Sequence, residues 1–260
     1  MTTNQNQTDC KIALITGSSR GIGLAIAKKL LADGYQVILN GSNNTQLQQV
    51  RDQIAEQYPL VDAISADVAD EHSVAQLFQQ IEKKYARLDV LVNNAGISPR
   101  LNGNKSTVET TPTDHWIKTI AINLTGAFFV TRAAIPLIKL SACGCVIQIA
   151  SQAGQMNTGF ASAHYATSKA GLIGFSRILA GELGQFGITV NCVSPGKIQT
   201  EMASTYRNAA AIEQSYIDRT PMKRIGQVED VVGAVAFLAS QEARFISGAV
   251  LDVTGGFFMP

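Results

Sequence analysis

The sequence predicts an α/β fold in which helices cover both faces of a parallel sheet. Seven short runs rich in β-branched residues alternate with longer segments of helical period, which is typical of βαβ units. The runs are almost continuously hydrophobic, as expected of strands that are buried on both faces. We therefore expect strands at 11–16, 36–39, 61–65, 90–93, 145–150, 188–194 and 249–253.

Length and composition narrow the class of protein. A chain of 260 residues with 46% hydrophobic residues can bury a sizeable core, so we expect one domain over 11–260. Residues 1–10 are polar and lack an apolar signal core, which predicts a disordered lead and a cytoplasmic location. The formal net charge of +1 gives no basic excess for nucleic acid, and no segment approaches the roughly 20 apolar residues that cross a bilayer. Nucleic-acid and membrane partners are thus disfavoured.

Cysteine and histidine residues predict no metal site. Cys143 and Cys145 form an isolated C-x-C, and no second Cys/His cluster completes a set of ligands. We interpret the four cysteines as thiols without a special role. The three histidines are scattered, so we interpret them as structural or solvated; they are His72, His115 and His164.

A glycine-rich turn follows the first expected strand in "TGSSRGIGLAIAKKL". Glycines permit a tight turn and close approach of the backbone, and the helix that follows offers its free N–H groups to phosphate. The spacing G-x-x-x-G-x-G differs from the general fingerprint G-x-G-x-x-G, but it joins a strand directly to a helix. We therefore predict a pyrophosphate cradle formed by Gly17, Ser19, Arg20, Gly21, Ile22 and Gly23.

The end of the second strand bears on the choice of dinucleotide. An acidic residue there would hold the ribose of NAD and repel a 2′-phosphate, but "ILNGSNN" offers only neutral Asn40 and Ser42. Arg20 of the glycine loop supplies a positive charge that can pair with a phosphate; the alternative is a solvated loop cation. NADP(H) is favoured, with NAD(H) as the alternative cofactor.

Tyr165 and Lys169 in "YATSK" lie four residues apart on a helix expected over about 161–186, so they share one face. A phenol with a pKa near 10 is a poor acid or base at neutral pH. An ammonium at about 4 Å favours the phenolate by roughly 4 kcal/mol in an effective dielectric near 20, although desolvation opposes this. Tyr165 is thereby a candidate general acid. The alternative is a half-buried tyrosine beside a solvent-facing lysine.

Two further polar residues accompany this pair. Ser151 ends the strand "CVIQIAS", from where its hydroxyl can bind a substrate oxygen; alternatively it caps a turn. Asn123 interrupts the apolar helical pattern "WIKTIAINLTGAFFVTRAAI", where an amide is out of place unless its polar group is used. Two stretches, 97–111 and 196–220, break the alternation after strands, and we expect these loops to set the substrate.

Together, the ordered motifs "TGSSRGIG", "DV" at 67–68, "NNAG" at 93–96, "IN", Ser151, "YATSK" and "PG" at 195–196 resemble the short-chain dehydrogenase/reductase family. The resemblance implies a doubly wound, single-domain Rossmann fold with a seven-stranded parallel sheet. It also implies a catalytic set, with Asn123 holding a water that links Lys169 to solvent; the set is Asn123, Ser151, Tyr165 and Lys169. Further cofactor contacts are implied at Asp67 and Val68 beside the adenine, at Asn94, Ala95, Gly96, Pro195, Gly196 and Ile198, and at Thr200 near the carboxamide. Tyr165 and Lys169 are also expected to contact the cofactor, with Lys169 anchoring the ribose.

Within the family, "KAGLIGFSR" and "GITVNCVSPGKIQTEM" are similar to 3-oxoacyl-[acyl-carrier-protein] reductases. Those enzymes carry basic residues for the acidic carrier protein where this chain has Ala142 and Phe186, and their loop after "NNAG" is shorter. This disfavours the carrier protein as a partner. We expect a small-molecule ketone or alcohol, with a 3-oxoacyl thioester as one candidate. The alternatives are an NAD-dependent dehydrogenase of a small secondary alcohol and a non-catalytic dinucleotide-binding regulator.

The resemblance also points to a homotetramer, because the segments "FFVTRAAIPLIKL" and "AGLIGFSRILAGEL" carry more apolar positions than one sheet face needs.

Overall fold

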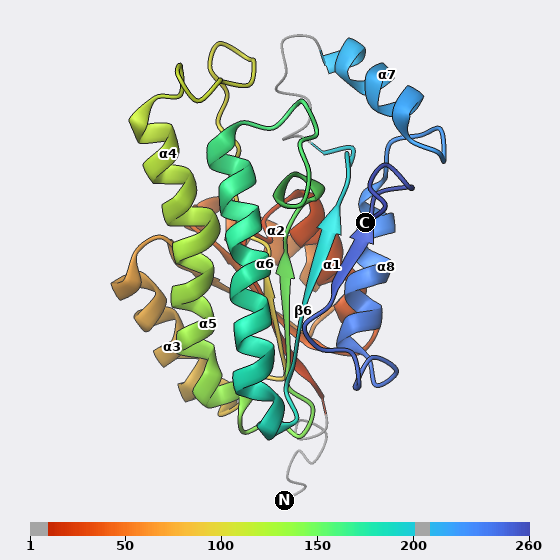
Figure 1. The fold of residues 1–260 in the computed structure, drawn as a ribbon. Coiled ribbons are helices and arrows are strands. Elements are labelled where there is room, and N and C mark those ends of the chain that lie inside the picture. Colours follow the sequence, from red (N-terminus) through yellow and green to blue (C-terminus); the bar gives the residue numbers. More distant parts are fainter. Residues whose placement is uncertain (1–9, 201–208) are drawn as a thin grey trace, which may run out of the picture.

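The computed structural model describes residues 10–200 and 209–260 and contains one parallel sheet of seven strands (Figure 1). The strands lie in the order β3-β2-β1-β4-β5-β6-β7, so the winding reverses between β1 and β4. Their bounds are β1 Ile12–Ile15, β2 Gln36–Gly41, β3 Val61–Ser65, β4 Val90–Asn93, β5 Cys145–Ile149, β6 Thr189–Pro195 and β7 Val250–Val253. The predicted fold class and all seven strands are confirmed.

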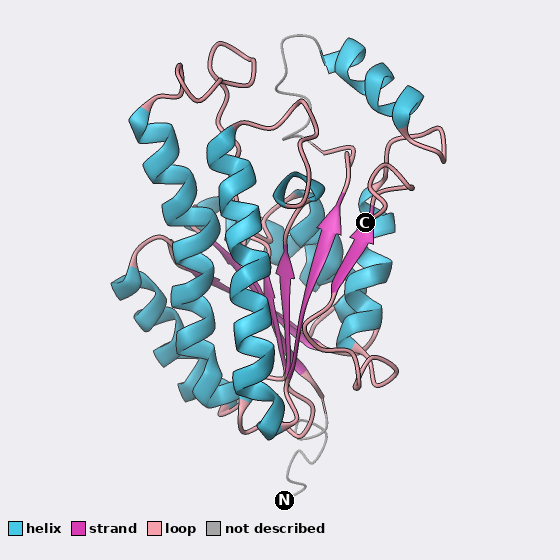
Figure 2. Ribbon diagram, viewed as in Figure 1, coloured by secondary structure: helices cyan, strands magenta, loops and turns pink. Residues whose placement is uncertain are grey.

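Helices cover both faces of this sheet (Figure 2). Alternate strand residues point to opposite faces, so Ile15 packs with α1, α2 and α8, whereas Leu14 packs with α3, α5 and α6. The helices are α1 Gly21–Ala32, α2 Asn44–Ala55, α3 Glu71–Tyr85, α4 Thr113–Ile120, α5 Gly126–Ile138, α6 Ala163–Leu183, α7 Ala209–Arg219 and α8 Val228–Ala239. The helix expected over 161–186 is α6, followed by the 3-10 turn η4, Gly184–Phe186.

Two elements differ from the sequence-based expectation. The stretch 196–220 was expected as a loop, but the helix α7 occupies its second half. Tyr216 is the buried residue of α7, so this helix has no apolar stripe to mark it in the sequence. The second difference is a π-helical turn, η2 at Ala121–Thr125, which joins α4 to α5.

The expectation that no segment is apolar enough to cross a bilayer was wrong. The continuous helix Thr113–Ile138 is long and apolar enough by length and composition, with a mean hydropathy of 1.5. Packing accounts for part of this composition, because Val130, Ala134 and Ile138 of the helix are fully buried in the core beneath the sheet. Other apolar residues of the helix, among them Ile117, are exposed.

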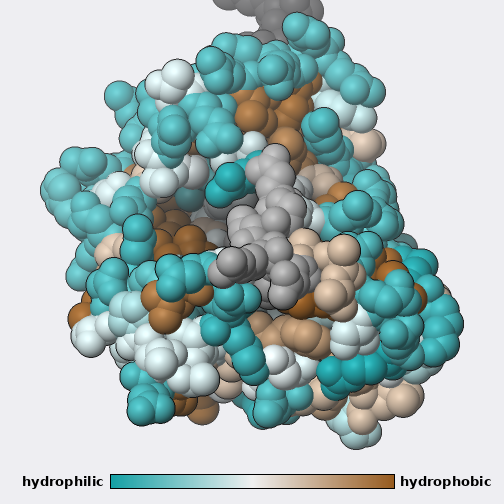
Figure 3. Space-filling model, turned by 90° about the horizontal axis from the view of Figure 1, so that it is seen from above, coloured by the Kyte–Doolittle hydropathy of each residue, from teal (hydrophilic) through white to brown (hydrophobic). Residues whose placement is uncertain are grey.

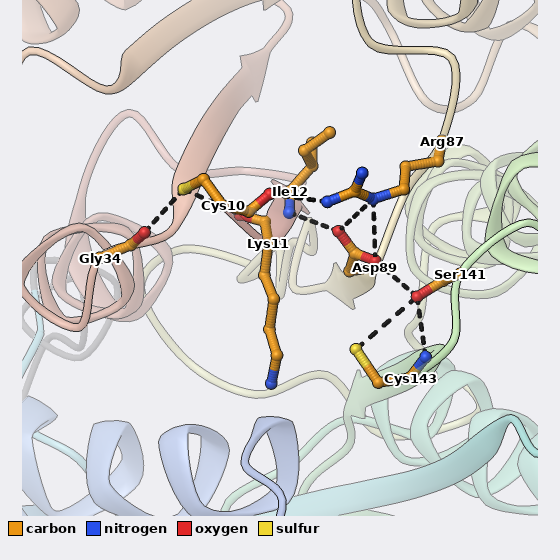
Figure 4. Close-up of polar contacts among 8 residues, drawn as sticks. All are labelled: Cys10, Lys11, Ile12, Gly34, Arg87, Asp89, Ser141 and Cys143. Atoms are coloured by element: carbon orange, nitrogen blue, oxygen red, sulfur yellow. Dashed lines mark hydrogen bonds and ion pairs between the residues drawn. The ribbon is translucent and has the colours of Figure 1, made fainter. Parts of the chain in front are cut away.

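A polar cluster around Asp89 ties together the amino ends of β1 and β4 (Figure 4). The Asp89 carboxylate is 3% exposed and accepts hydrogen bonds from the Ile12 backbone N–H at 2.7 Å, from Arg87 Nε at 3.2 Å and from the Ser141 hydroxyl. Arg87 also donates to the carbonyl of Cys10.

Cys10 was expected in the disordered lead, but its thiol donates to the Gly34 carbonyl and its backbone is held by Arg87. The rest of the expected lead, residues 1–9, lies outside the described residues.

Candidate active site

A cavity of about 400 Å³ opens at the carboxyl edge of the sheet. Seen from above, this face is hollowed, and both hydrophilic and hydrophobic residues surround the hollow (Figure 3). Segments that follow β1, β2, β3, β4, β5 and β6 line it, together with residues of α6 and α7. It therefore spans the point between β1 and β4 where the winding reverses, which is where open α/β sheets bind ligands.

The glycine loop lines the cavity. Gly17 and Gly21 have positive φ values of 62° and 56°, which favour glycine. A Cβ at Gly17 would lie 2.8 Å from the Cα of Ala95, so the loop also packs directly on the segment after β4. The side chain of Asn94 fixes this arrangement by donating to the carbonyls of Thr16 and Gly17, each at 2.9 Å.

The rim beyond β2 is neutral, as the sequence predicts. Ser42 is exposed and lines the cavity, and Ser19 lies beside Gly41. Arg20 also lines this end of the cavity. By contrast, Asn40 is fully buried, and its amide donates to the carbonyls of Ile64 and Ala66. The side chain of Asn40 therefore ties β2 to β3.

Most of the other predicted cofactor residues line the same cavity. This holds for Ile22, Asp67, Val68, Ala95, Gly96, Pro195, Gly196, Ile198 and Thr200. Gly23 does not; it is buried where α1 begins, and a Cβ there would lie 2.4 Å from Asn94 Nδ2 and 2.5 Å from the Gly17 carbonyl oxygen. Gly23 thus shapes the loop from behind.

Ser151 caps a turn, which is one of the two roles that the sequence left open, and it also lies at the cavity. It follows β5 and is almost buried, and its Oγ accepts a hydrogen bond from the N–H of Ala153 at 3.2 Å, which caps a 3-10 turn. The same residue lines the cavity. Because a hydroxyl can accept and donate at once, the cap orients the oxygen while leaving its hydrogen available for a ligand.

Tyr165 and Lys169 lie near each other on α6, and both line the cavity. Lys169 Nζ is 5.8 Å from the centroid of the Tyr165 ring and donates to the carbonyl of Ile149 at 2.7 Å. Lys169 is only 4% exposed, and burial lowers its pKa to about 8. The lysine is therefore not solvent-facing, which excludes the alternative weighed for this pair.

Asn123 lies in the π-helical turn η2 and is fully buried. Its Oδ1 accepts from the N–H of Ile97 at 2.8 Å, and its Nδ2 donates to the carbonyl of Ile97 at 2.9 Å and to Ser168 Oγ at 3.1 Å. A Cβ at Gly96 would lie 3.4 Å from Asn123 Oδ1 and 3.5 Å from Lys169 Nζ. The amide thus fixes the start of the loop after β4 and lies close to the ammonium.

Sequence reasoning missed two cations of the cavity wall, Arg100 and Lys197. Both belong to the stretches 97–111 and 196–220 that were expected to set the substrate, but neither was singled out. The available signal was a basic residue shortly after "NNAG" and another directly after "PG".

Histidines and cysteines contribute little to the cavity. His164 is buried against Thr119, 3.1 Å from His164 Nδ1 to Thr119 Oγ1, and burial lowers its pKa. The four cysteines are free thiols. Within residues 10–200 and 209–260, no group of three or more His, Cys, Asp or Glu side chains is arranged to hold a metal ion.

Comparison with known proteins identifies the family. A family model described as enoyl-(acyl carrier protein) reductase matches residues 17–258. The 3-oxoacyl-[acyl-carrier-protein] reductase of Aquifex aeolicus is 36% identical over 250 residues, which cover 95% of this chain and 97% of that protein. The chain belongs to the short-chain dehydrogenase/reductase family. It is accordingly an NAD(P)-dependent oxidoreductase, most similar to 3-oxoacyl-[acyl-carrier-protein] reductases.

Solved structures of this family share the fold. A 3-oxoacyl-[acyl-carrier protein] reductase with bound NAD from Brucella melitensis has a TM-score of 0.85 and 33% identity, covering 96% of this chain and 92% of that chain. A putative gluconate dehydrogenase from Agrobacterium tumefaciens has a TM-score of 0.89 and 29% identity, covering 95% of each chain. The sheet described above is the Rossmann fold of short-chain dehydrogenases/reductases.

Proposed function

We propose that the protein is an NADPH-dependent carbonyl reductase that interconverts a carbonyl compound and its secondary alcohol. The observation that carries the proposal is the meeting of Tyr165, buried Lys169 and Ser151 in one cavity with the glycine loop. A regulator that only binds dinucleotides would have no use for a lysine whose burial lowers its pKa beside a tyrosine.

The residues present fit a nicotinamide dinucleotide. Gly21 at the start of α1 faces open space that can hold a pyrophosphate, since a Cβ there would meet nothing within 4 Å. The neutral rim at Ser42 and the positive charge of Arg20 favour a 2′-phosphate. When bound, the reduced nicotinamide supplies the hydride for the carbonyl carbon.

The chain's own residues supply the proton and the orientation. The Ser151 hydroxyl, oriented by its cap on Ala153, donates a hydrogen bond to the substrate oxygen. Tyr165 gives its phenolic proton to that oxygen as the carbon is reduced. The Lys169 ammonium lies by the ring and favours the resulting phenolate. Solvent then returns a proton to Tyr165, and Asn123 beside Lys169 forms part of the path.

Replacement of the tyrosine tests this function. In Tyr165→Phe we expect NADPH to bind as before, measured by fluorescence titration, while kcat for ketone reduction falls about 100-fold or more, the usual range for loss of a general acid. Tyr58→Phe, on a tyrosine that does not line the cavity, is the matched control. Near-normal turnover by Tyr165→Phe would exclude it as the proton donor.

A 3-oxoacyl thioester is the second candidate substrate, because the relatives most similar in sequence are 3-oxoacyl-[acyl-carrier-protein] reductases. The positions of Ala142 and Phe186 do not lack neighbouring cations: Arg244 donates to the Ala142 carbonyl at 3.5 Å, and Lys139 Nζ lies 3.9 Å from the centroid of the Phe186 ring.

Kinetic measurements with the same 3-oxoacyl group, bound either to a carrier protein or to a small thiol, test whether the enzyme prefers the carrier-bound form. Because Ala142 and Phe186 themselves carry no positive charge, we expect similar kcat/KM values for the two forms, despite the neighbouring Arg244 and Lys139. A strong preference for the carrier that fades with salt would instead favour carrier docking.

A further inference from the structure

Two cations, Arg100 and Lys197, line the same cavity as Ser151. Arg100 lies in the loop after β4 and Lys197 in the segment after β6, and both line the cavity. Strands β4 and β6 are the two neighbours of β5 in the sheet, and Ser151 follows β5. The two cations therefore belong to the segments that follow the strands on either side of β5, and they line the same cavity as Ser151.

A small aromatic cluster holds these cations in the wall. Arg100 Nη1 donates to the carbonyl of Phe160 at 3.0 Å, five residues before Tyr165. The Phe160 ring lies 4.6 Å from the ring of Tyr216, and Lys197 Nζ lies 6.0 Å from the Tyr216 centroid. Arg100, Phe160, Tyr216 and Lys197 thus form one continuous part of the wall, built from four separate segments of the chain.

The part of the cavity lined by Arg100 and Lys197 is positively charged. Among the cavity-lining residues that the structure describes, Asp67 is the one carboxylate, and it lies beyond β3 at the opposite end. Burial and the charge of Arg100 both lower the pKa of Lys197, while Glu213 on α7 opposes them. Both cations also have partners within the protein, so a ligand would join existing contacts. Two like charges in a partly buried wall favour an anionic ligand over a neutral one.

We propose that the substrate carries an anionic group, a carboxylate or a phosphate, close to the carbonyl that is reduced, and that Arg100 and Lys197 bind this group. The proposal rests on the proposed function and adds a class of substrate to it. An oxo acid would bind with its anionic oxygens on the two cations and its carbonyl oxygen at Ser151 and Tyr165. A neutral ketone or an ester would leave both cations without this partner.

Matched substrate pairs test the proposal on the wild-type enzyme. Pyruvate, acetoacetate and levulinate are each compared with their methyl esters, and dihydroxyacetone phosphate with dihydroxyacetone, as oxidants of NADPH. For at least one pair we expect kcat/KM to be about 10-fold or more higher for the anion, since a hydrogen bond to a charged group accounts for at least that factor. The pairs that show it distinguish carboxylate from phosphate.

Variants of Arg100 and Lys197 test whether these two residues cause the preference for the anion. Arg100→Gln and Lys197→Gln should each reduce the ratio of anion to neutral kcat/KM by about 10-fold, through KM for the anion. Arg100→Lys keeps the charge and should keep most of the ratio. Lys105→Gln removes an exposed cation of the same loop that does not line the cavity, and should leave the ratio unchanged.

Each contrary result has its own meaning. If wild type turns over anions and their neutral partners equally, the proposal is overturned, but the proposed carbonyl reductase function is unaffected. This comparison uses wild type alone, so it holds even where a variant fails to fold. An unchanged ratio in a folded Arg100→Gln, with KM for NADPH raised instead, assigns the cations to the cofactor and also overturns it. No NADPH oxidation with any member of the panel contradicts the proposed function itself.

Discussion

Lys169 is a buried lysine whose pKa is lowered by its burial. The sequence predicts an ammonium that favours the phenolate of Tyr165, and the structure adds that the ammonium is almost fully buried and donates to the Ile149 carbonyl. Burial lowers the pKa of Lys169 from 10.5 to about 8. The lysine is thus still charged at neutral pH, but it becomes neutral at a far lower pH than an exposed lysine.

This shift predicts a pH-dependent stability. Between about pH 8 and pH 10.5 the unfolded lysine holds a proton that the folded lysine has released, so the free energy of unfolding rises with pH in this window. In this window we expect the free energy of unfolding of wild type to rise relative to that of Lys169→Met by about 1.4 kcal/mol per pH unit, measured by urea unfolding without cofactor. Below pH 8 the difference should be flat. A difference that stays constant up to pH 10.5 would mean that Lys169 keeps an ordinary pKa.

Cofactor preference is predicted to depend on Ser42. In Ser42→Asp the new carboxylate would repel a 2′-phosphate, so the ratio of kcat/KM for NADPH to that for NADH should fall about 10-fold. Asn44→Asp places the same charge on a residue that does not line the cavity and should change the ratio less. Equal kcat/KM for the two nucleotides in wild type would contradict the assignment of Arg20 to the phosphate. Asn40→Asp is unsuitable, because it removes the donor to the Ile64 and Ala66 carbonyls.

Sequence patterns locate the candidate site better than they orient its side chains. The motifs bring Tyr165, Lys169 and Ser151 to one cavity because the ends of parallel strands meet at one edge of a sheet. Orientation depends on partners distant in sequence. The side chain of Asn40 turns to β3, and Asn123 binds the backbone of Ile97, which no local pattern reveals. For the same reason Arg100 and Lys197 did not stand out.

At the level of elements, the strands are predictable because burial on both faces leaves a continuous hydrophobic run. The π-helical turn Ala121–Thr125 is not, because the apolar period continues across it from α4 into α5. Its cause is tertiary: Asn123 within the turn pairs with both backbone groups of Ile97. Such turns are rare and occur frequently at functional sites, in agreement with its position beside Lys169.

The Asp89 cluster is predicted to hold the amino ends of β1 and β4 in place. In Asp89→Ala the Ile12 N–H, the Arg87 guanidinium and the Ser141 hydroxyl lose their shared acceptor in a buried position. We expect the free energy of unfolding to fall by about 3 kcal/mol, measured by urea unfolding. Asp52→Ala, whose side chain is 66% exposed beside Arg51, should cost under about 0.5 kcal/mol. A loss at Asp89 no larger than this control would show that the cluster is dispensable.

At the scale of the whole molecule, large apolar side chains remain exposed on α4, α5 and α6. They include Trp116 at 41%, Ile117 at 62%, Phe128 at 40% and Ile178 at 65% exposure. These helices cover the same side of the sheet (Figure 1). A surface of this kind is expected to pack against a second copy of the chain.

Together with the family resemblance, which implies four copies, this surface leads us to predict a homotetramer with a mass by light scattering of about four times the 27.7 kDa of one chain. Ile178→Glu should lower this mass, because it brings a charge into the apolar surface of α6. Val108→Glu, on a side chain that is 79% exposed in the loop before α4, should not. A mass near 27.7 kDa at micromolar concentration would contradict the prediction.

The contact of Asn94 with the glycine loop has a thermodynamic consequence for nucleotide binding. Because Asn94 bonds the carbonyls of Thr16 and Gly17 within the protein itself, the loop loses its conformational entropy when the chain folds, not when a ligand arrives. The loop is in this sense preorganised, and the free energy of association is not spent on ordering it. Affinity for the dinucleotide is thereby linked to the stability of the fold through one amide, in the segment that follows β4.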